Sequence, residues 1–154
     1  MSYAKSVLQP GESIIAEGRL HWIIYRWAIL FLVIGVAVVW LEDVYWPTHD
    51  GLITVTALTF GVLFLAAFLY AWFIRWITEF AVTNRRVISS RIFISRNTEE
   101  MSMDKVETVD IDQSVLGRIL GYGTMRITGT GGTNNIEVSR MAAPFALRNA
   151  IMTK

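Results

Sequence analysis

The chain has 154 residues, of which 53% are hydrophobic and 18% are charged, so a membrane protein is the first class to consider. Its formal net charge of +1 gives the chain as a whole no electrostatic attraction to nucleic acid. Because it contains no cysteine, disulfides, thiolate nucleophiles and zinc sites built on sulfur are excluded.

The first segment, residues 1–21, is mixed in polarity and precedes a long apolar run. Within residues 11–20, GESIIAEGRL, the pair Ile14 and Ile15 lies between turn-forming residues. This pattern indicates a short strand that supplements a sheet formed later in the chain.

Two apolar runs follow, and each is long enough to cross a bilayer as a helix. Residues 23–41 contain one charged side chain, Arg26, and residues 52–74 contain none. A hydrocarbon core about 30 Å thick needs roughly 20 helical residues, and hydrocarbon offers no partner to an unpaired backbone amide. Tryptophan and tyrosine flank both runs, as in the aromatic belts of membrane proteins. We therefore predict a transmembrane helical hairpin over residues 22–75.

Buried helices of a soluble domain and a cleaved signal peptide both fit these runs less well. Buried helices usually keep a polar stripe and are shorter, and no small-residue cleavage site follows the first run. The connector carries Glu42, Asp43 and Asp50 but no lysine or arginine, whereas basic residues lie before and after the hairpin. The positive-inside rule then predicts a multi-pass protein with both termini in the cytoplasm.

Beyond the hairpin, residues 76–154 consist of short alternating stretches separated by turn signals, which predicts a small β-rich domain. The Thr83-Asn84 pair turns the chain after the first strand, and GTGGTNN at residues 129–135 joins the last two strands. The positions expected to share the inner face are Phe80, Val82, Ile88, Ser90, Ile92, Ile94, Met101, Met103, Val109, Ile111, Met125, Ile127, Ile136 and Val138.

Two short helices are predicted in this domain. Ser114 suits the N-cap of VLGRILG, and Gly121 ends that helix. Its apolar face comprises Val115, Leu116, Ile119 and Leu120. A second helix has Pro144 in its first turn and is expected to cover an open end of a small barrel. The residues at helical spacing are Ala143, Leu147, Ala150 and Ile151.

Two longer motifs carry a family resemblance. The sequences FAVTNRRVI at residues 80–88 and VETVDIDQSVLGRILGYGTMRI at residues 106–127, together with the preceding hairpin, resemble the bacterial membrane-flanked pleckstrin-homology-like (bacterial PH) domain family. The resemblance implies an α+β membrane protein in which a strongly bent antiparallel sheet is closed by a C-terminal helix. It implies no catalytic reaction, and it places the chain in the bacterial cytoplasmic (inner) membrane.

Residues suited to catalysis are few. His21 and His49 are the only histidines, and the predicted topology puts them on opposite sides of the membrane, where they cannot share a metal or a proton relay. The glycine-rich GTGGT and GYG lack the lysine of a phosphate-binding loop, and DKVETVDID at residues 104–112 alternates as a strand rather than a calcium loop. We therefore expect no enzymatic activity, no cofactor and no metal site.

Four arginines gather shortly after the predicted membrane exit, with Glu79 nearby; they are Arg85, Arg86, Arg91 and Arg96. Three interpretations remain: a solvated strand face, a contact with anionic lipid headgroups, or a protein-docking surface. Nucleic acid is not expected, because aromatic residues are not interleaved with the exposed charges.

These patterns predict a non-enzymatic interaction module anchored in the membrane. Tethering raises the effective concentration of the domain near membrane partners, so weak contacts suffice. The expected partner is a protein, including another copy of this chain, with lipid headgroups assisting. The alternative is an accessory subunit of a transport or envelope-stress system, in which the hairpin makes the contact.

Overall fold

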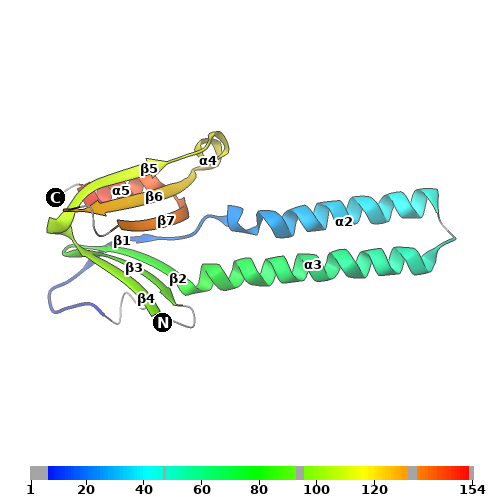
Figure 1. Ribbon diagram of the computed structural model, residues 1–154, viewed down its shortest axis with the longest axis horizontal. Helices are drawn as coiled ribbons and strands as arrows, with labels where there is room; N and C mark the ends of the chain where they lie inside the picture. The colour runs from blue at the N-terminus through cyan, green and yellow to red at the C-terminus, as the bar shows by residue number, and fades with distance from the viewer. Residues whose placement is uncertain (1–6, 47, 93–95, 132–134, 153–154) are drawn as a thin grey trace. The chain divides into compact units, whose positions relative to one another are not determined.

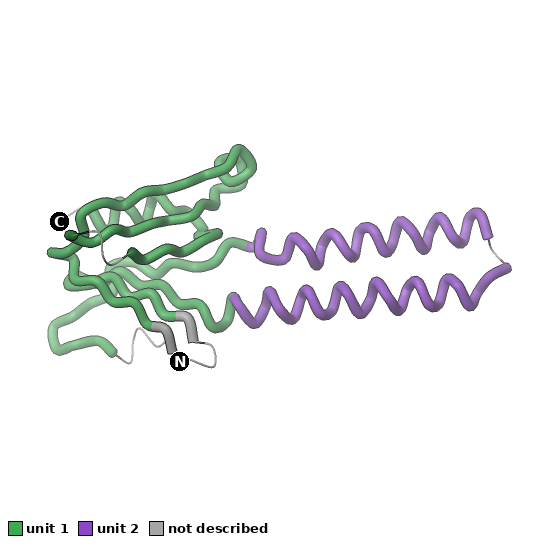
Figure 2. The backbone as a smooth tube through the Cα atoms, viewed as in Figure 1, with its two compact units in different colours: residues 1–21, 75–154 green, residues 22–74 purple. Residues whose placement is uncertain are grey.

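The computed structural model describes residues 7–46, 48–92, 96–131 and 135–152, and the chain divides into two compact units. The β-unit comprises residues 1–21 and 75–154, and the hairpin unit comprises residues 22–74 (Figure 2). The β-unit is therefore discontinuous in sequence. The sequence-based division, in which a separate domain begins at residue 76, divides this unit, because the N-terminal segment folds together with the C-terminal part.

The hairpin unit is built from two long helices. A 3-10 turn, η1 (Trp22–Tyr25), leads into α2 (Arg26–Tyr45), and α3 (Asp50–Ile77) follows after a short connector (Figure 1). At about 1.5 Å per residue these helices are about 30 Å and about 42 Å long. Both are long and apolar enough to cross a membrane. The helices extend further into the connector than the apolar runs, so Glu42 and Asp43 lie in the last turns of α2.

Contacts between α2 and α3 run along the hairpin. A Cβ added at Gly35 would lie 2.6 Å from the Cβ of Phe60, so a glycine is needed at this contact between the two helices. Nearer the connector, Thr56 Oγ1 donates a hydrogen bond to Glu42 Oε1 at 2.9 Å. The helices are in close contact at Gly35, whereas a Cβ at Gly61 would meet nothing within 4 Å.

The first sheet of the β-unit has four antiparallel strands in the order β1-β2-β3-β4. They are β1 (Ile14–Gly18), β2 (Thr78–Thr83), β3 (Arg86–Ile92) and β4 (Arg96–Ser102). The N-terminal segment thus supplies an edge strand to a sheet whose other strands come after the hairpin. Gly18 permits this pairing, because a Cβ there would lie 2.7 Å from the ring of Phe80.

The second sheet has three antiparallel strands in the order β5-β6-β7. After the 3-10 turn η2 (Met103–Lys105) the elements are β5 (Val106–Asp112), α4 (Val115–Leu120), β6 (Tyr122–Gly129), β7 (Asn135–Ala142) and α5 (Pro144–Met152). An isolated bridge between Leu20 and Met141 joins the chain just after β1 to β7. The single bent sheet or barrel expected from the sequence is therefore two antiparallel sheets with a C-terminal helix.

The core of the β-unit is formed by aliphatic side chains and methionines of both sheets and by one face of α5. Its largest fully buried residues include Val82, Val87, Ile88, Met125, Ile127, Val138 and Met141. Strict alternation fails in the first sheet, where Val87 and Ile88 are adjacent and both buried. Ile94 lies outside the described residues.

The two caps of α4 and the first turn of α5 are as the sequence predicts. Ser114 Oγ accepts a hydrogen bond from Gly117 N at 3.1 Å, and Gly121 ends α4 with a positive φ of 76°. Pro144 is the first residue of α5. The predicted face of the second helix needs one correction. Ala143 is exposed with a φ of 47° and precedes the helix, so the buried face of α5 is Pro144, Leu147 and Ile151. The predicted aliphatic face of α4 is exposed.

Candidate functional site

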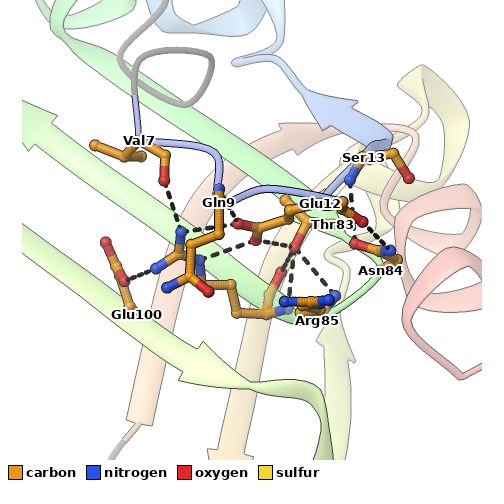
Figure 3. A network of polar contacts seen from close by, with 10 residues as sticks. Val7, Gln9, Glu12, Ser13, Thr83, Asn84, Arg85 and Glu100 are labelled. Carbon is orange, nitrogen blue, oxygen red and sulfur yellow. Dashed lines mark hydrogen bonds and ion pairs between the residues drawn. The ribbon is translucent and has the colours of Figure 1, made fainter.

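The turn between β2 and β3, which carries Arg85, is held by side-chain hydrogen bonds. Thr83 Oγ1 accepts hydrogen bonds from the backbone N–H groups of Arg85 at 3.2 Å and Arg86 at 3.0 Å, which closes the turn. Asn84 then fixes the turn to the N-terminal segment: its Oδ1 accepts from Ser13 N at 3.1 Å, and its Nδ2 donates to Gly11 O at 3.2 Å. These contacts are drawn in Figure 3.

Beside this turn, Glu12 and Arg86 form a two-pronged ion pair (Figure 3). Arg86 Nε donates to Glu12 Oε1 and Arg86 Nη2 donates to Glu12 Oε2, both at 2.9 Å. Thr83 Oγ1 donates to the same Oε1 at 2.7 Å, and Gln9 N donates to Oε2 at 2.9 Å. The Glu12 side chain is 0% exposed, and four hydrogen bonds replace its lost hydration.

The electrostatics of the pair keep both groups charged. The hydrogen bond from Arg86 lowers the pKa of Glu12 from 4.5 to about 2, although burial alone would raise it. The hydrogen bond that Arg86 donates to Glu12 in turn raises the pKa of Arg86. The ion pair therefore stays intact throughout the physiological pH range.

Arg86 does not belong to an exposed basic surface. Its side chain is 17% exposed, Nη1 donates to Glu100 Oε2 at 2.7 Å, and Nη2 also donates to Val7 O at 2.7 Å. Both ends of the guanidinium donate to acceptors within the protein. The predicted contact of Arg86 with headgroups or a partner is therefore wrong. It is a structural residue that ties β3 to the N-terminal segment.

The other three predicted arginines are not brought together by the described contacts. Arg85 is exposed next to the β2–β3 turn. The backbones of Arg91 and Arg96 lie in β3 and β4, but their side chains are outside the described part of the structure. Sequence reasoning missed Glu12, which lies 74 residues before its partner, and no local pattern could have revealed that pairing.

A polar cavity of about 590 Å³ lies next to the ion pair. Its lining combines Arg85 and Arg86 with Glu100 and Asp104. Because basic and acidic side chains are balanced there, this cavity has no electrostatic preference for an anion.

A second cavity, of about 320 Å³, lies where the chain leaves and re-enters the β-unit. Leu20 and Arg75 both line it, together with Arg19. Thr78 contributes a buried Oγ1 that has no hydrogen-bond partner in the structure. Glu17 and Glu79 also line this cavity, so basic and acidic side chains are balanced here too.

The histidines occupy separate settings. His21 stacks on Tyr122 with ring centroids 5.2 Å apart, and the backbone N–H of His49 donates to Trp46 O in the connector. Within the residues that the structure describes, no group of three or more His, Cys, Asp or Glu side chains could hold a metal ion.

A family model described as "Bacterial PH domain" matches residues 22–153. The chain belongs to the bacterial PH domain family. The bacterial PH domain match includes the hairpin and β2 through β7 but begins after β1, so the strand from the N-terminal segment lies outside the matched region. Comparison with curated proteins and with solved structures found no match.

Proposed function

We propose that this bacterial PH domain protein is a non-enzymatic interaction module held at the cytoplasmic face of the bacterial inner membrane by its hairpin. The observation that carries the proposal is the exposed apolar surface of α2 and α3. Val36, Leu58 and Val62 are 63%, 64% and 65% exposed, and most other aliphatic residues of the two helices are exposed as well. Exposing a continuous apolar surface of this length to water carries a large free-energy cost, which lipid chains around the helices would remove.

The charge distribution supports the orientation. Asp43 and Asp50 are exposed close to the connector, whereas Arg26 and Arg75 lie near the opposite ends of the two helices. This asymmetry follows the positive-inside rule and supports a β-unit on the cytoplasmic side. Arg19 and Arg75, which line the second cavity together with Glu17 and Glu79, would then be in reach of anionic headgroups.

A protein contact is the first role we propose for the β-unit. β4 and β5 lie at the ends of their sheets, and each is paired on one side only. An unpaired strand edge can receive a strand from another chain through main-chain hydrogen bonds. On β5 the exposed side chains include Glu107, Asp110 and Asp112, so a partner strand with basic side chains, or a second copy docking through a basic segment, fits this edge.

The anchoring can be tested with single cysteines, because the natural chain has none. His49→Cys and Thr130→Cys would be treated in intact cells with a maleimide that cannot cross the inner membrane. We expect labelling at position 49 without lysis and labelling at position 130 only after permeabilisation. Labelling of position 130 in intact cells, with position 49 protected, would overturn the proposed orientation.

The protein contact can be tested in the same full-length chain with photocrosslinking amino acids. Glu107, on the β5 edge, would be replaced in one variant, and Arg148, an exposed residue of α5, would serve as the matched control. We expect crosslinked products, including a dimer of the chain, from position 107 and few from position 148. Equal yields at the two positions would exclude the β5 edge as the contact.

A second candidate function is that of an accessory subunit that contacts its partner through the hairpin. It is favoured by an apolar groove of about 540 Å³ in the hairpin unit, lined by residues that include Gly35, Val39, Phe60 and Phe64. Such a groove can receive side chains of another transmembrane helix. Crosslinking from position 39 but not from position 107 would favour this function over the first.

A further inference from the structure

The short helix α4 exposes almost all of its apolar surface. Val115, Leu116 and Ile119 are 77%, 64% and 74% exposed, and Leu120 is 38% exposed. The buried residue of the helix is Gly117. The helix therefore places a glycine against the body of the β-unit and directs its aliphatic side chains outward, the reverse of a surface helix in a soluble protein.

This orientation is fixed by contacts on the buried side of α4. A Cβ added to Gly117 would lie 2.7 Å from the carbonyl oxygen of Tyr122, so the helix backbone rests directly on the start of β6. Gln113 Nε2 donates to the same Tyr122 carbonyl at 2.9 Å, and the Ser114 cap holds the first turn. The aliphatic side chains cannot turn inward without breaking these contacts.

The position of α4 in the β-unit indicates what covers it. Figure 1 shows α4 at one end of β5 and β6. Tyr122, which supports α4, stacks on His21, and His21 N donates to Arg140 O at 2.8 Å. His21 is the last residue of the β-unit before the chain enters the hairpin. The exposed aliphatic face of α4 therefore lies near His21, after which the polypeptide enters its first long apolar helix.

The charges around this end match a membrane surface. Arg118 lies within α4, and Arg19 is linked through its carbonyl to Ala142 N at 2.9 Å, next to Arg140. Within the described residues, no salt bridge involves any of these three arginines. Asp112 is the nearest acid in the sequence to α4, and Glu17 and Glu79 line the same cavity as Arg19. Aliphatic side chains flanked by basic residues are typical of segments that lie in the interface of an anionic bilayer.

We infer that α4 inserts its aliphatic side chains into the cytoplasmic surface of the same bilayer that holds the hairpin. The inference rests on the proposed function, because it requires the hairpin to be in the membrane. A lipid surface fits better than a protein, since four side chains on one short helix present far less than the roughly 800 Å² per partner of a stable protein interface. Because the hairpin holds the β-unit at the membrane, the effective concentration of α4 at the bilayer surface is high. Shallow insertion of its side chains is therefore sufficient. The β-unit then contacts the bilayer directly rather than only through its connections to the hairpin.

The test uses the full chain in vesicles of phosphatidylethanolamine and phosphatidylglycerol. Three single-cysteine variants carry an environment-sensitive fluorophore: Ile119→Cys on α4, Leu58→Cys in the hairpin, and Thr130→Cys at the opposite end of β6 as the control. Spin-labelled lipids in the vesicles quench a fluorophore that lies in the bilayer. We expect quenching at positions 58 and 119 to be severalfold stronger than at position 130. Adding Leu116→Asp should reduce the quenching at position 119 and leave position 58 unchanged.

Each alternative result has a definite meaning. Quenching at position 58 with position 119 as water-exposed as position 130 would overturn the inference and leave the proposed anchoring intact. A fluorophore at position 119 that is shielded from water but not quenched by spin-labelled lipid would show a protein cover instead, and would also overturn it. Absence of quenching at position 58 would refute the proposed membrane anchoring and this inference together. Normal hydrogen exchange of β5 and β6 in the Ile119→Cys variant confirms that the fold is retained.

Discussion

The carboxylate of Glu12 shows how a single residue can hold two distant parts of a chain together. It is fully buried, and its charge is tolerated because Arg86, Thr83 and the Gln9 amide together satisfy both oxygens. Removing one partner of such a pair leaves the other charge without compensation, which costs more than the pair itself contributes. The stability of the β-unit should therefore depend on Glu12 more than on any exposed acid.

Replacing Glu12→Gln should destabilise the β-unit by about 3 kcal/mol, the lower end for a broken buried ion pair, because Arg86 is partly exposed and keeps Glu100. Amide hydrogen exchange of β2 and β3 in the full chain measures the effect. The control is Glu137→Gln in the Arg126 pair, whose side chains are 56% and 49% exposed, where we expect less than about 1 kcal/mol. Equal changes in the two variants would contradict the structural role of Glu12.

The lowered pKa of Glu12 also predicts an acid dependence. The folded state holds the carboxylate with a pKa of about 2 against an ordinary value of 4.5, so the folded state binds the proton more weakly than the unfolded chain. The contribution to stability is complete above pH 4.5 and is lost as the pH falls towards 2, by up to about 3 kcal/mol. Thermal unfolding of the β-unit followed across this range should show a steeper decline in the natural chain than in Glu12→Gln. Parallel curves would show that other carboxylates govern the acid response.

At the scale of elements, local chemistry was readable from the sequence and long-range geometry was not. The long apolar runs, the Ser114 cap, the Gly121 stop and Pro144 depend on neighbouring residues, and the structure has all of them. The outward face of α4 depends on Gly117 meeting β6, which helical spacing cannot reveal. In the same way, the charges close to Arg86 in the sequence suggest an exposed side chain. Its acidic partners lie further away in the sequence, in β4 and in the N-terminal segment.

The two glycines of the hairpin provide a matched pair for testing the packing of α2 against α3. Gly61→Ala adds a methyl group in open space and should raise stability by up to about 1 kcal/mol through helix propensity. Gly35→Ala gains the same propensity but places its methyl 2.6 Å from Phe60, so the helices must separate. We expect a lower thermal midpoint for Gly35→Ala than for Gly61→Ala, measured by far-ultraviolet circular dichroism in detergent. Identical midpoints would indicate that the helices do not pack closely at Gly35.

At the scale of the whole molecule, the hairpin is an insertion between two parts of one folded unit. β1 pairs with β2 across the insertion, and Leu20 bridges to Met141. Leu20 and Arg75 line the same cavity, so the segment before the hairpin and the segment after it lie close together within the β-unit. The β-unit is therefore expected to fold without the hairpin only if its N-terminal part is kept.

Two shortened chains test this expectation. In the first, residues 22–74 are replaced by a short Gly/Ser linker, which keeps β1, Glu12 and the Leu20 bridge; we expect a soluble chain whose β2 and β3 amides are protected from hydrogen exchange. The second contains residues 75–154 alone, where β2 loses its neighbour β1 and Arg86 loses its buried partner. Unsatisfied strand hydrogen bonds and an uncompensated charge should leave its amides exchanging rapidly. Equal protection in the two chains would mean that the N-terminal segment is an accessory to the fold, since only the first chain can form the Glu12–Arg86 pair.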